Sequence, residues 1–293
     1  MAPLKVFASP RTHGANGYST MTPVSDGNTV YVFFGNGIAA AYDFEGKRKW
    51  LRLVQKPTQG WGSSASPLIA DGKLIIHVNT MYGLDLKTGK TVWETKTRHS
   101  WGTSIPFQLG DKVLIATPGG DIINPKDGKS LIAKKLIKLS YNAPLWHDNV
   151  LYYIQANSAA YSFSWEGEKL ITKELWKSKL QGGRYYASPL IHDGIIYGVN
   201  QKSFLTALNT ADGIEIYKQD LKLGGTAYPS PVLIGTTLLV SSDNGKTAVI
   251  VAGKEYKALG QNISEKGRSS FIIEDDKIYY HGLKNLYCIQ EGK

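Results

Sequence analysis

Most of the arginine side chains of this sequence lie in a set of seven stretches that together contain almost no acidic residues. The stretches cover about residues 8–20, 55–64, 96–103, 138–142, 179–187, 222–229 and 260–268. Four of the six arginines and two of the six histidines lie there, namely Arg11, Arg98, Arg184, Arg268, His13 and His99. Glu265 is the one acidic residue among them. Guanidinium groups bind carboxylates and sulfates through paired hydrogen bonds, so these stretches are suited to an anionic ligand.

Nearly every stretch also carries an aromatic residue close to its end. These residues are Tyr18, Trp61, Trp101, Tyr141, Tyr185 (or its neighbour Tyr186) and Tyr228. Their rings could stack on sugars or other flat groups, or they could only wedge neighbouring repeats apart. His281, which precedes Gly282 at a predicted strand end, could line the same surface. The predicted ligand-binding residues are therefore Tyr18, Trp61, Arg98, His99, Trp101, Tyr141, Arg184, Tyr185, Tyr228, Arg268 and His281.

The other reactive side chains form no recognisable catalytic pattern. Glycoside hydrolysis needs two carboxylates across the scissile bond, which these stretches lack, and no GxSxG elbow is present. The single cysteine, Cys288, excludes an intramolecular disulfide and a CxxCH haem site, and its alternating surroundings favour a packed strand residue. The spacing of His13, His99 and His281 does not support a metal site, and His77 is expected in the core. No metal and no cofactor are therefore expected.

A Ser/Ala-x-Pro-apolar element recurs along the chain and sets its organisation. Its prolines are Pro23, Pro67, Pro106, Pro144, Pro189 and Pro231, and a seventh copy, Ser269-Ser270-Phe271, has Ser270 in place of proline. The six intervals average roughly 41 residues, a period typical of propeller blades.

Each repeat contains the same series of short elements. A polar turn such as Asp71-Gly72 leads to an alternating apolar strand such as 74–78, and a Gly/Asn loop leads to a third strand and second turn. The fourth strand carries a bulky aromatic in several copies: Trp50, Trp93, Tyr217 and Trp176. This pattern predicts an all-β fold, a seven-bladed β-propeller of four-stranded antiparallel blades.

The two ends of the chain predict how the propeller closes. The seventh repeat stops at Lys293, before a fourth strand, and residues 4–7 have the length and alternation to supply it. We expect this N-terminal strand to pair in the last blade, with Phe7 in the position of Trp50, because pairing removes open sheet edges. Residues 1–293 would then form a single domain, with repeats starting near residues 17, 61, 101, 141, 185, 228 and 268.

Composition excludes several classes of function. The chain of 293 residues is 42% hydrophobic and has a net charge of +10. Its basic residues are mostly dispersed lysines, which favours a solvated surface over nucleic-acid binding. The longest apolar runs are strand-sized, so no membrane span is expected, and no leader is visible at Met1.

The third and fourth strands carry a family resemblance. An A-x-D-x-x-x-G-x-x-x-W pattern, seen at residues 41–50, 83–93 and 207–217, resembles the tryptophan-docking repeats of the pyrroloquinoline-quinone-like (PQQ-like) propellers. That family includes quinoprotein alcohol dehydrogenases and the outer-membrane assembly lipoprotein of Gram-negative bacteria. Its quinoproteins have eight blades, a calcium site and a disulfide of adjacent cysteines. Seven repeats and one cysteine depart from that pattern, so the resemblance implies the repeat without the quinone, and the partners of the eight-bladed lipoprotein do not carry over.

These observations favour a non-catalytic binding or scaffold propeller that recognises an anionic ligand, an acidic carbohydrate or an acidic protein segment, on its inter-blade loops. The alternative is a lyase acting on uronate-containing or other acidic polysaccharide, with a Tyr or His base and Arg to neutralise charge. If the protein is an enzyme, this lyase is a better candidate than a hydrolase or a quinoprotein dehydrogenase. The relatives that it resembles suggest a periplasmic or secreted location.

Overall fold

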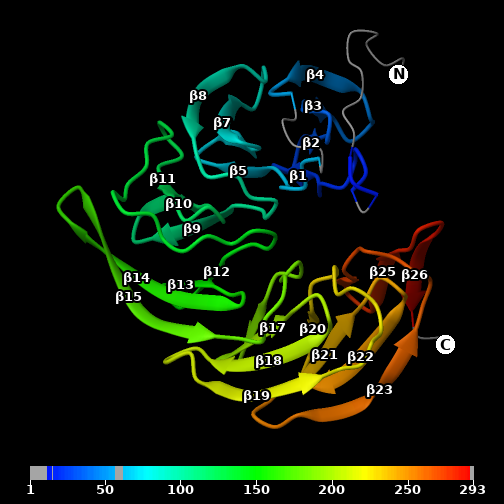
Figure 1. The fold of residues 1–293 in the computed structure, drawn as a ribbon. Helices are drawn as coiled ribbons and strands as arrows, with labels where there is room; N and C mark the ends of the chain where they lie inside the picture. The colour runs from blue at the N-terminus through cyan, green and yellow to red at the C-terminus, as the bar shows by residue number, and fades with distance from the viewer. Residues whose placement is uncertain (1–11, 15, 57–61, 291–293) are drawn as a thin grey trace. The chain divides into compact units, whose positions relative to one another are not determined.

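The computed structural model describes residues 12–14, 16–56 and 62–290, and within these ranges all regular structure is β-strand (Figure 1). Seven antiparallel sheets follow one another along the chain. This series confirms the predicted all-β, seven-bladed propeller, and we call the sheets blades 1 to 7.

The strands of blades 1 to 3 are β1 (Val24–Ser25), β2 (Val30–Phe33), β3 (Ile38–Tyr42) and β4 (Arg48–Leu53); β5 (Leu68–Ala70), β6 (Lys73–His77), β7 (Thr80–Asp85) and β8 (Thr91–Lys96); and β9 (Ile105–Leu109), β10 (Lys112–Ala116) and β11 (Ile122–Ile123). Blade 4 has β12 (Leu145–His147), β13 (Val150–Tyr153), β14 (Asn157–Glu166) and β15 (Lys169–Lys179). Blades 5 to 7 have β16 (Leu190–His192), β17 (Ile195–Val199), β18 (Phe204–Asn209) and β19 (Glu215–Asp220); β20 (Val232–Ile234), β21 (Thr237–Ser241), β22 (Lys246–Val251) and β23 (Lys257–Ile263); and β24 (Ile272–Glu274), β25 (Lys277–His281) and β26 (Leu286–Gln290).

The chain divides into two compact units. The first is Met1–Ser140 with Ser164–Ile171, and the second is Tyr141–Phe163 with Thr172–Lys293. Blades 1 to 3 belong to the first unit and blades 5 to 7 to the second, while the tip of the β14–β15 hairpin of blade 4 belongs to the first.

Short turns join the first two strands of each blade, as the sequence predicts. Asp71 and Gly72 lie between β5 and β6 with φ of 48° and 66°, and Asp193 and Gly194 lie between β16 and β17 with φ of 46° and 72°. Positive φ at both central residues is the type I′ geometry, whose twist matches that of the flanking strands.

The aromatic residue of a fourth strand packs on the next blade in the chain. The indole nitrogens of Trp50, Trp93 and Trp176 donate to the carbonyls of Leu86, Pro125 and Thr210 at 2.8, 2.9 and 2.9 Å. These three tryptophans therefore dock as the resemblance to the tryptophan-docking repeats implies. Phe7, the expected counterpart in the last blade, and the strand 4–7 that would carry it, lie outside the described residues.

A second periodic contact links the residues that precede the repeat prolines. In the first unit the amide of Thr22 donates to Oγ of Ser66, and the amide of Ser66 donates to Oγ1 of Thr103, both at 3.0 Å. In the second unit three such bonds run along Ala143, Ser188, Ser230 and Ser270. Ser270 therefore matches the residue before the proline, and Phe271, not Ser270 as predicted, stands in the position of the proline. Thr103, three residues before Pro106, therefore takes the place expected for Ile105, so the repeat element of blade 3 is shifted by two residues.

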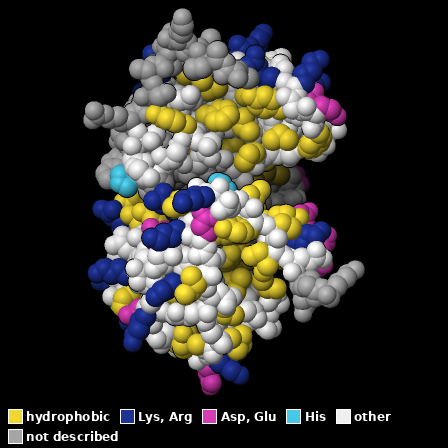
Figure 2. Space-filling model, turned by 90° about the vertical axis from the view of Figure 1, so that its right-hand side faces the viewer, with side chains coloured by type: hydrophobic (Ala, Val, Ile, Leu, Met, Phe, Trp, Pro, Cys, Tyr) yellow, Lys and Arg dark blue, Asp and Glu magenta, His cyan; other side chains and the backbone are white. Residues whose placement is uncertain are grey.

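Three blades depart from the repeat. Blade 3 has three strands, and beyond β11 it continues through a single bridge between Ile123 and Ser130. Blade 7 has three strands in the described part of the chain. In blade 6, Gly260 of β23 pairs with Val249 beside a bulge, where Trp50 pairs with Ala41 in blade 1, and every residue of β23 is exposed. The hydrophobic side chains of Leu259 and Ile263 in β23 are accordingly exposed. Figure 2 shows hydrophobic side chains at the surface among lysines and arginines on one face of the molecule.

The core lies between the sheets of each unit. Alternating strand residues such as Leu74 and Ile76 in the first unit, and Tyr197 and Leu238 in the second, are fully buried. No helix in the described ranges is long and apolar enough to cross a membrane.

Candidate ligand-binding site

Three tyrosines from successive inter-blade loops of the second unit form a continuous row. The ring centroids of Tyr141 and Tyr186 are 4.9 Å apart with an interplanar angle of 63°, and those of Tyr186 and Tyr228 are 4.8 Å apart at 29°. Arg184 lies with its guanidinium carbon 5.9 Å from the Tyr141 ring, and that of Arg268 lies 5.8 Å from the Tyr228 ring. We call these five residues the tyrosine–arginine row.

The repeat itself builds this row. One residue of each blade takes part in the amide-to-hydroxyl bonds between blades, and we call it the relay residue; in this unit these residues are Ala143, Ser188, Ser230 and Ser270. The row members Tyr141, Tyr186, Tyr228 and Arg268 each stand two residues before the relay residue of their blade. The loops are also anchored to the turns between second and third strands. The amide of Gln201 donates to the carbonyl of Arg184 at 2.7 Å, and that of Asp243 donates to the carbonyl of Thr226 at 3.0 Å. Backbone hydrogen bonds therefore hold the loops that carry the row.

The charge of the row is positive and partly pre-organised. Nη1 of Arg184 donates to Oη of Tyr186 at 3.1 Å, and this bond raises the pKa of the arginine. Both arginines are exposed, whereas the three tyrosines are half-buried. Burial, followed by the neighbouring Tyr186, raises the pKa of Tyr228. The row thus presents aromatic faces and two fixed cations, a combination that suits an anion with an apolar or flat portion.

The sequence offered Tyr185 or its neighbour Tyr186 for the fifth stretch and named Tyr185 as the ligand-binding residue, but it is Tyr186 whose ring lies in the row. Tyr185 is only 3% exposed, and its hydroxyl donates to the carbonyl of Gln181 at 2.8 Å. Burial raises its pKa strongly. Adjacent side chains in an extended segment point to opposite sides, so Tyr185 packs in the core while Tyr186 joins the row.

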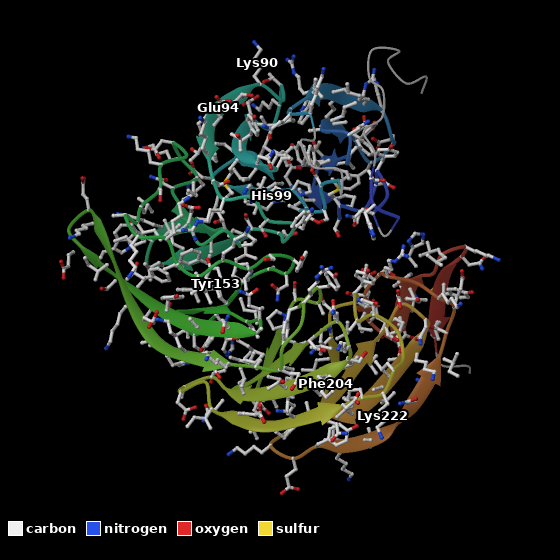
Figure 3. The ribbon with its side chains drawn as sticks, viewed as in Figure 1. Lys90, Glu94, His99, Tyr153, Phe204 and Lys222 are labelled. Atoms are coloured by element: carbon white, nitrogen blue, oxygen red, sulfur yellow. The ribbon has the colours of Figure 1, made fainter. Side chains whose placement is uncertain are left out.

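In the first unit, three of the predicted residues follow one another closely on a single loop. The rings of His99 and Trp101 meet edge to face with centroids 4.5 Å apart on the loop between β8 and β9, where Figure 3 labels His99. Arg98, beside them, is exposed. Burial, followed by the charge of Lys138, lowers the pKa of His99, which keeps its ring neutral at neutral pH.

Of the remaining predicted residues, two are exposed, and the backbone of His281 exchanges hydrogen bonds with Oγ of Ser269, the residue after Arg268. Tyr18 is exposed in the first unit, and the side chain of His281 is exposed at the end of β25 in the second. Trp61 and Arg11 lie outside the described residues. His77 is a core histidine as expected, since Nδ1 lies 3.1 Å from Oγ of Ser104 and Nε2 lies 2.7 Å from Oγ1 of Thr97.

Two acidic residues belong to the loops and turns around the row: Asp243, which lies outside the seven stretches, and Glu265, which the sequence analysis named. Asp243, in the turn between β21 and β22, accepts a hydrogen bond from the amide of Thr226 at 2.9 Å and acts electrostatically on Tyr228. Glu265 accepts from the amide of Lys284, Nδ2 of Asn285 and Oη of Tyr287. Burial opposes ionisation of Glu265, but these hydrogen bonds outweigh it and lower its pKa. Both carboxylates are thus already engaged by donors of the protein.

These features define a class: a β-propeller of the binding or scaffold type. The chain belongs to the family described as outer membrane protein assembly factor BamB, whose sequence profile matches residues 8–97 and 77–291. This membership confirms the resemblance to the PQQ-like repeat.

Solved structures show the same fold. The crystal structure of BamB from Moraxella catarrhalis is 20% identical, with a TM-score of 0.68 over 94% of this chain and 83% of that chain. The C-terminal WD40 domain of Sif2 is 11% identical, with a TM-score of 0.66 over 92% of this chain and 80% of that chain. The computationally designed Ika8 protein is 12% identical, with a TM-score of 0.55 over 92% and 94%. No curated protein matches the sequence.

Proposed function

We propose that this protein is a non-catalytic scaffold that binds an acidic segment of a partner protein on the tyrosine–arginine row. The observation that carries the proposal is that Arg184 lies over the ring of Tyr141 and Arg268 over the ring of Tyr228, at the two ends of a continuous row of tyrosines. Aromatic and arginine side chains are the residue types that most often dominate protein–protein binding energy.

Family membership supports a protein as the ligand. The family is described as an assembly factor for outer-membrane proteins, and an assembly factor acts on polypeptide. A periplasmic or outer-membrane-associated location would follow from the same description. An acidic oligosaccharide is the other ligand that the row could hold, and the experiment below includes it.

The lyase alternative receives less support from the row. A tyrosine that removes a proton from a sugar works best when its pKa is close to the working pH. Burial raises the pKa of Tyr228 instead, which keeps its hydroxyl protonated. Tyr186 already accepts a hydrogen bond from Arg184. Both features favour holding a ligand over abstracting a proton.

Binding of two labelled peptides tests the proposal. Fluorescence anisotropy with fluorescein-labelled octaglutamate should show saturable binding that weakens as salt rises, because exposed charges are screened, whereas octaglutamine should bind much more weakly. Arg184→Gln and Arg268→Gln should each weaken octaglutamate binding about tenfold. Arg52→Gln, which changes an exposed arginine on β4, is the matched control and should leave affinity unchanged.

Three results would contradict the proposal. The first is equal binding of the two peptides, and the second is binding that ignores both row arginines. The third is preferential binding of an oligogalacturonate, which would identify a carbohydrate ligand. Growth of ultraviolet absorbance from unsaturated uronate during incubation with that oligosaccharide would identify a lyase.

A further inference from the structure

Three serine hydroxyls, each two residues after a member of the tyrosine–arginine row, form a hydrogen-bonded line from blade to blade. Oγ of Ser188 accepts the amide of Ala143 at 3.2 Å, Oγ of Ser230 accepts the amide of Ser188 at 3.0 Å, and Oγ of Ser270 accepts the amide of Ser230 at 2.9 Å. Each serine thus uses one lone pair to link its blade to the preceding one. The three residues are half-buried.

The donor side of these hydroxyls is unused. A serine hydroxyl has one O–H donor besides its acceptor lone pairs. Within residues 141–290, which the structure describes for this unit, none of the three O–H groups has a hydrogen-bond acceptor. Three neighbouring donors on one line are therefore free to bind an oxygen atom from outside the protein.

The spacing along the chain places these donors within reach of a ligand on the row. Ser188 follows Tyr186 by two residues, Ser230 follows Tyr228, and Ser270 follows Arg268. Two residues of chain span at most about 7 Å. A side chain of the bound segment that passes the ring of Tyr228 would therefore arrive at the hydroxyl of Ser230.

We infer that Ser188, Ser230 and Ser270 form a second layer of the binding site, which donates O–H hydrogen bonds to a carboxylate of the acidic segment. This inference rests on the proposed function. A carboxylate fits because it accepts several hydrogen bonds at once and donates none, and because Arg268, two residues before Ser270, supplies the balancing charge. An amide or hydroxyl ligand could use only part of this donor line.

Serine-to-alanine variants test the inference, with a control taken from the first unit. Ser230→Ala removes both the free donor and the acceptor for the Ser188 amide, so some loss of stability is expected. Ser66→Ala removes the same kind of acceptor, because Oγ of Ser66 accepts the amide of Thr22 at 3.0 Å. The residue two positions before Ser66 is Ser64, however, and not a tyrosine. Both variants should therefore melt earlier by similar amounts.

Their affinities for labelled octaglutamate should differ. Ser230→Ala should bind about five- to tenfold more weakly than wild type, and Ser66→Ala should bind as wild type does. Ser230→Thr keeps the hydroxyl and should retain binding, because Thr103 already fills this relay position in blade 3.

Wild-type affinity in Ser230→Ala would overturn the inference and leave the serines as blade links only. The proposed function would survive that result if Arg184→Gln and Arg268→Gln still weakened binding. Failure of the wild-type protein to bind octaglutamate would overturn both. Equal losses of affinity in Ser230→Ala and Ser66→Ala would assign the effect to stability and would also overturn the second layer.

Discussion

The indole of Trp50 packs directly on Gly89 of the following blade. A Cβ atom built on Gly89 would lie 2.7 Å from Cε3 of Trp50, and the glycine has a φ of 67°. Gly128 and Gly213 stand in the same relation to Trp93 and Trp176. The docking of an aromatic on the next blade therefore depends on a residue without a side chain.

Replacing this glycine should be costly. Gly89→Ala should lower the free energy of unfolding by about 2–4 kcal/mol, because it adds both a left-handed backbone strain and a clash with the indole. Gly72→Ala is the matched control, since Gly72 has a φ of 66° but nothing within 4 Å of the added atom. That variant should lose only about 1–2 kcal/mol. Urea unfolding of both variants measures the difference, and equal losses would contradict the packing argument.

The indole hydrogen bond should contribute separately from the ring. Trp176→Phe should destabilise the protein by about 1–3 kcal/mol, because the carbonyl of Thr210 loses the donor that lies 2.9 Å away and the ring shrinks. Tyr217→Phe should be neutral or stabilising, since the Tyr217 hydroxyl is buried without a hydrogen-bond partner in the described structure. Thermal melting of the two variants checks this contrast, and a large loss in Tyr217→Phe would reveal a partner for that hydroxyl.

Acid should weaken the fold through His77. Burial, followed by repulsion from His99, lowers the pKa of His77 to about 4, against an ordinary value of 6.5. Between these two pH values the unfolded chain binds a proton that the folded chain does not, so stability falls as pH drops from 6.5 towards 4. The loss should approach about 3 kcal/mol.

Urea unfolding at several pH values between 4 and 7 measures this loss. His77→Gln should have a flatter pH dependence than wild type over that window, although it will be less stable at pH 7 if the bonds to Ser104 and Thr97 weaken. Parallel pH profiles for the two proteins would show that His77 is not the group responsible.

Two neighbouring tyrosines should respond oppositely to the same substitution. Tyr186→Phe removes the oxygen that holds Nη1 of Arg184, so octaglutamate affinity should fall about three- to fivefold with little change in stability. Tyr185→Phe removes a bond to the carbonyl of Gln181 in the core, so it should cost about 1 kcal/mol of stability and leave affinity unchanged. Anisotropy and thermal melting of both variants separate the two roles. A larger affinity loss in Tyr185→Phe would contradict the assignment.

Local patterns in the sequence were sufficient to predict an all-β propeller of seven blades. The repeat prolines, the Asp-Gly turns and the alternating strands each depend on residues within one blade, where hydrophobic period and turn chemistry act directly. The fourth-strand aromatics could also be predicted from the sequence, because Trp50 and Trp93 each follow a turn glycine by four residues. The positions of Arg184 and Arg268 within inter-blade loops followed from the same repeat.

The make-up of the site depended on contacts between residues far apart in the sequence. Only the tertiary structure distinguishes Tyr186 from Tyr185, because which side of a loop faces the core depends on the neighbouring blade. The sequence did not predict that Asp243 lies near Tyr228, because the two residues belong to different loops. The hydroxyl line of Ser188, Ser230 and Ser270 joins residues about 40 positions apart. A repeat predicts that such residues are equivalent, but only the packing of one blade on the next decides that they touch.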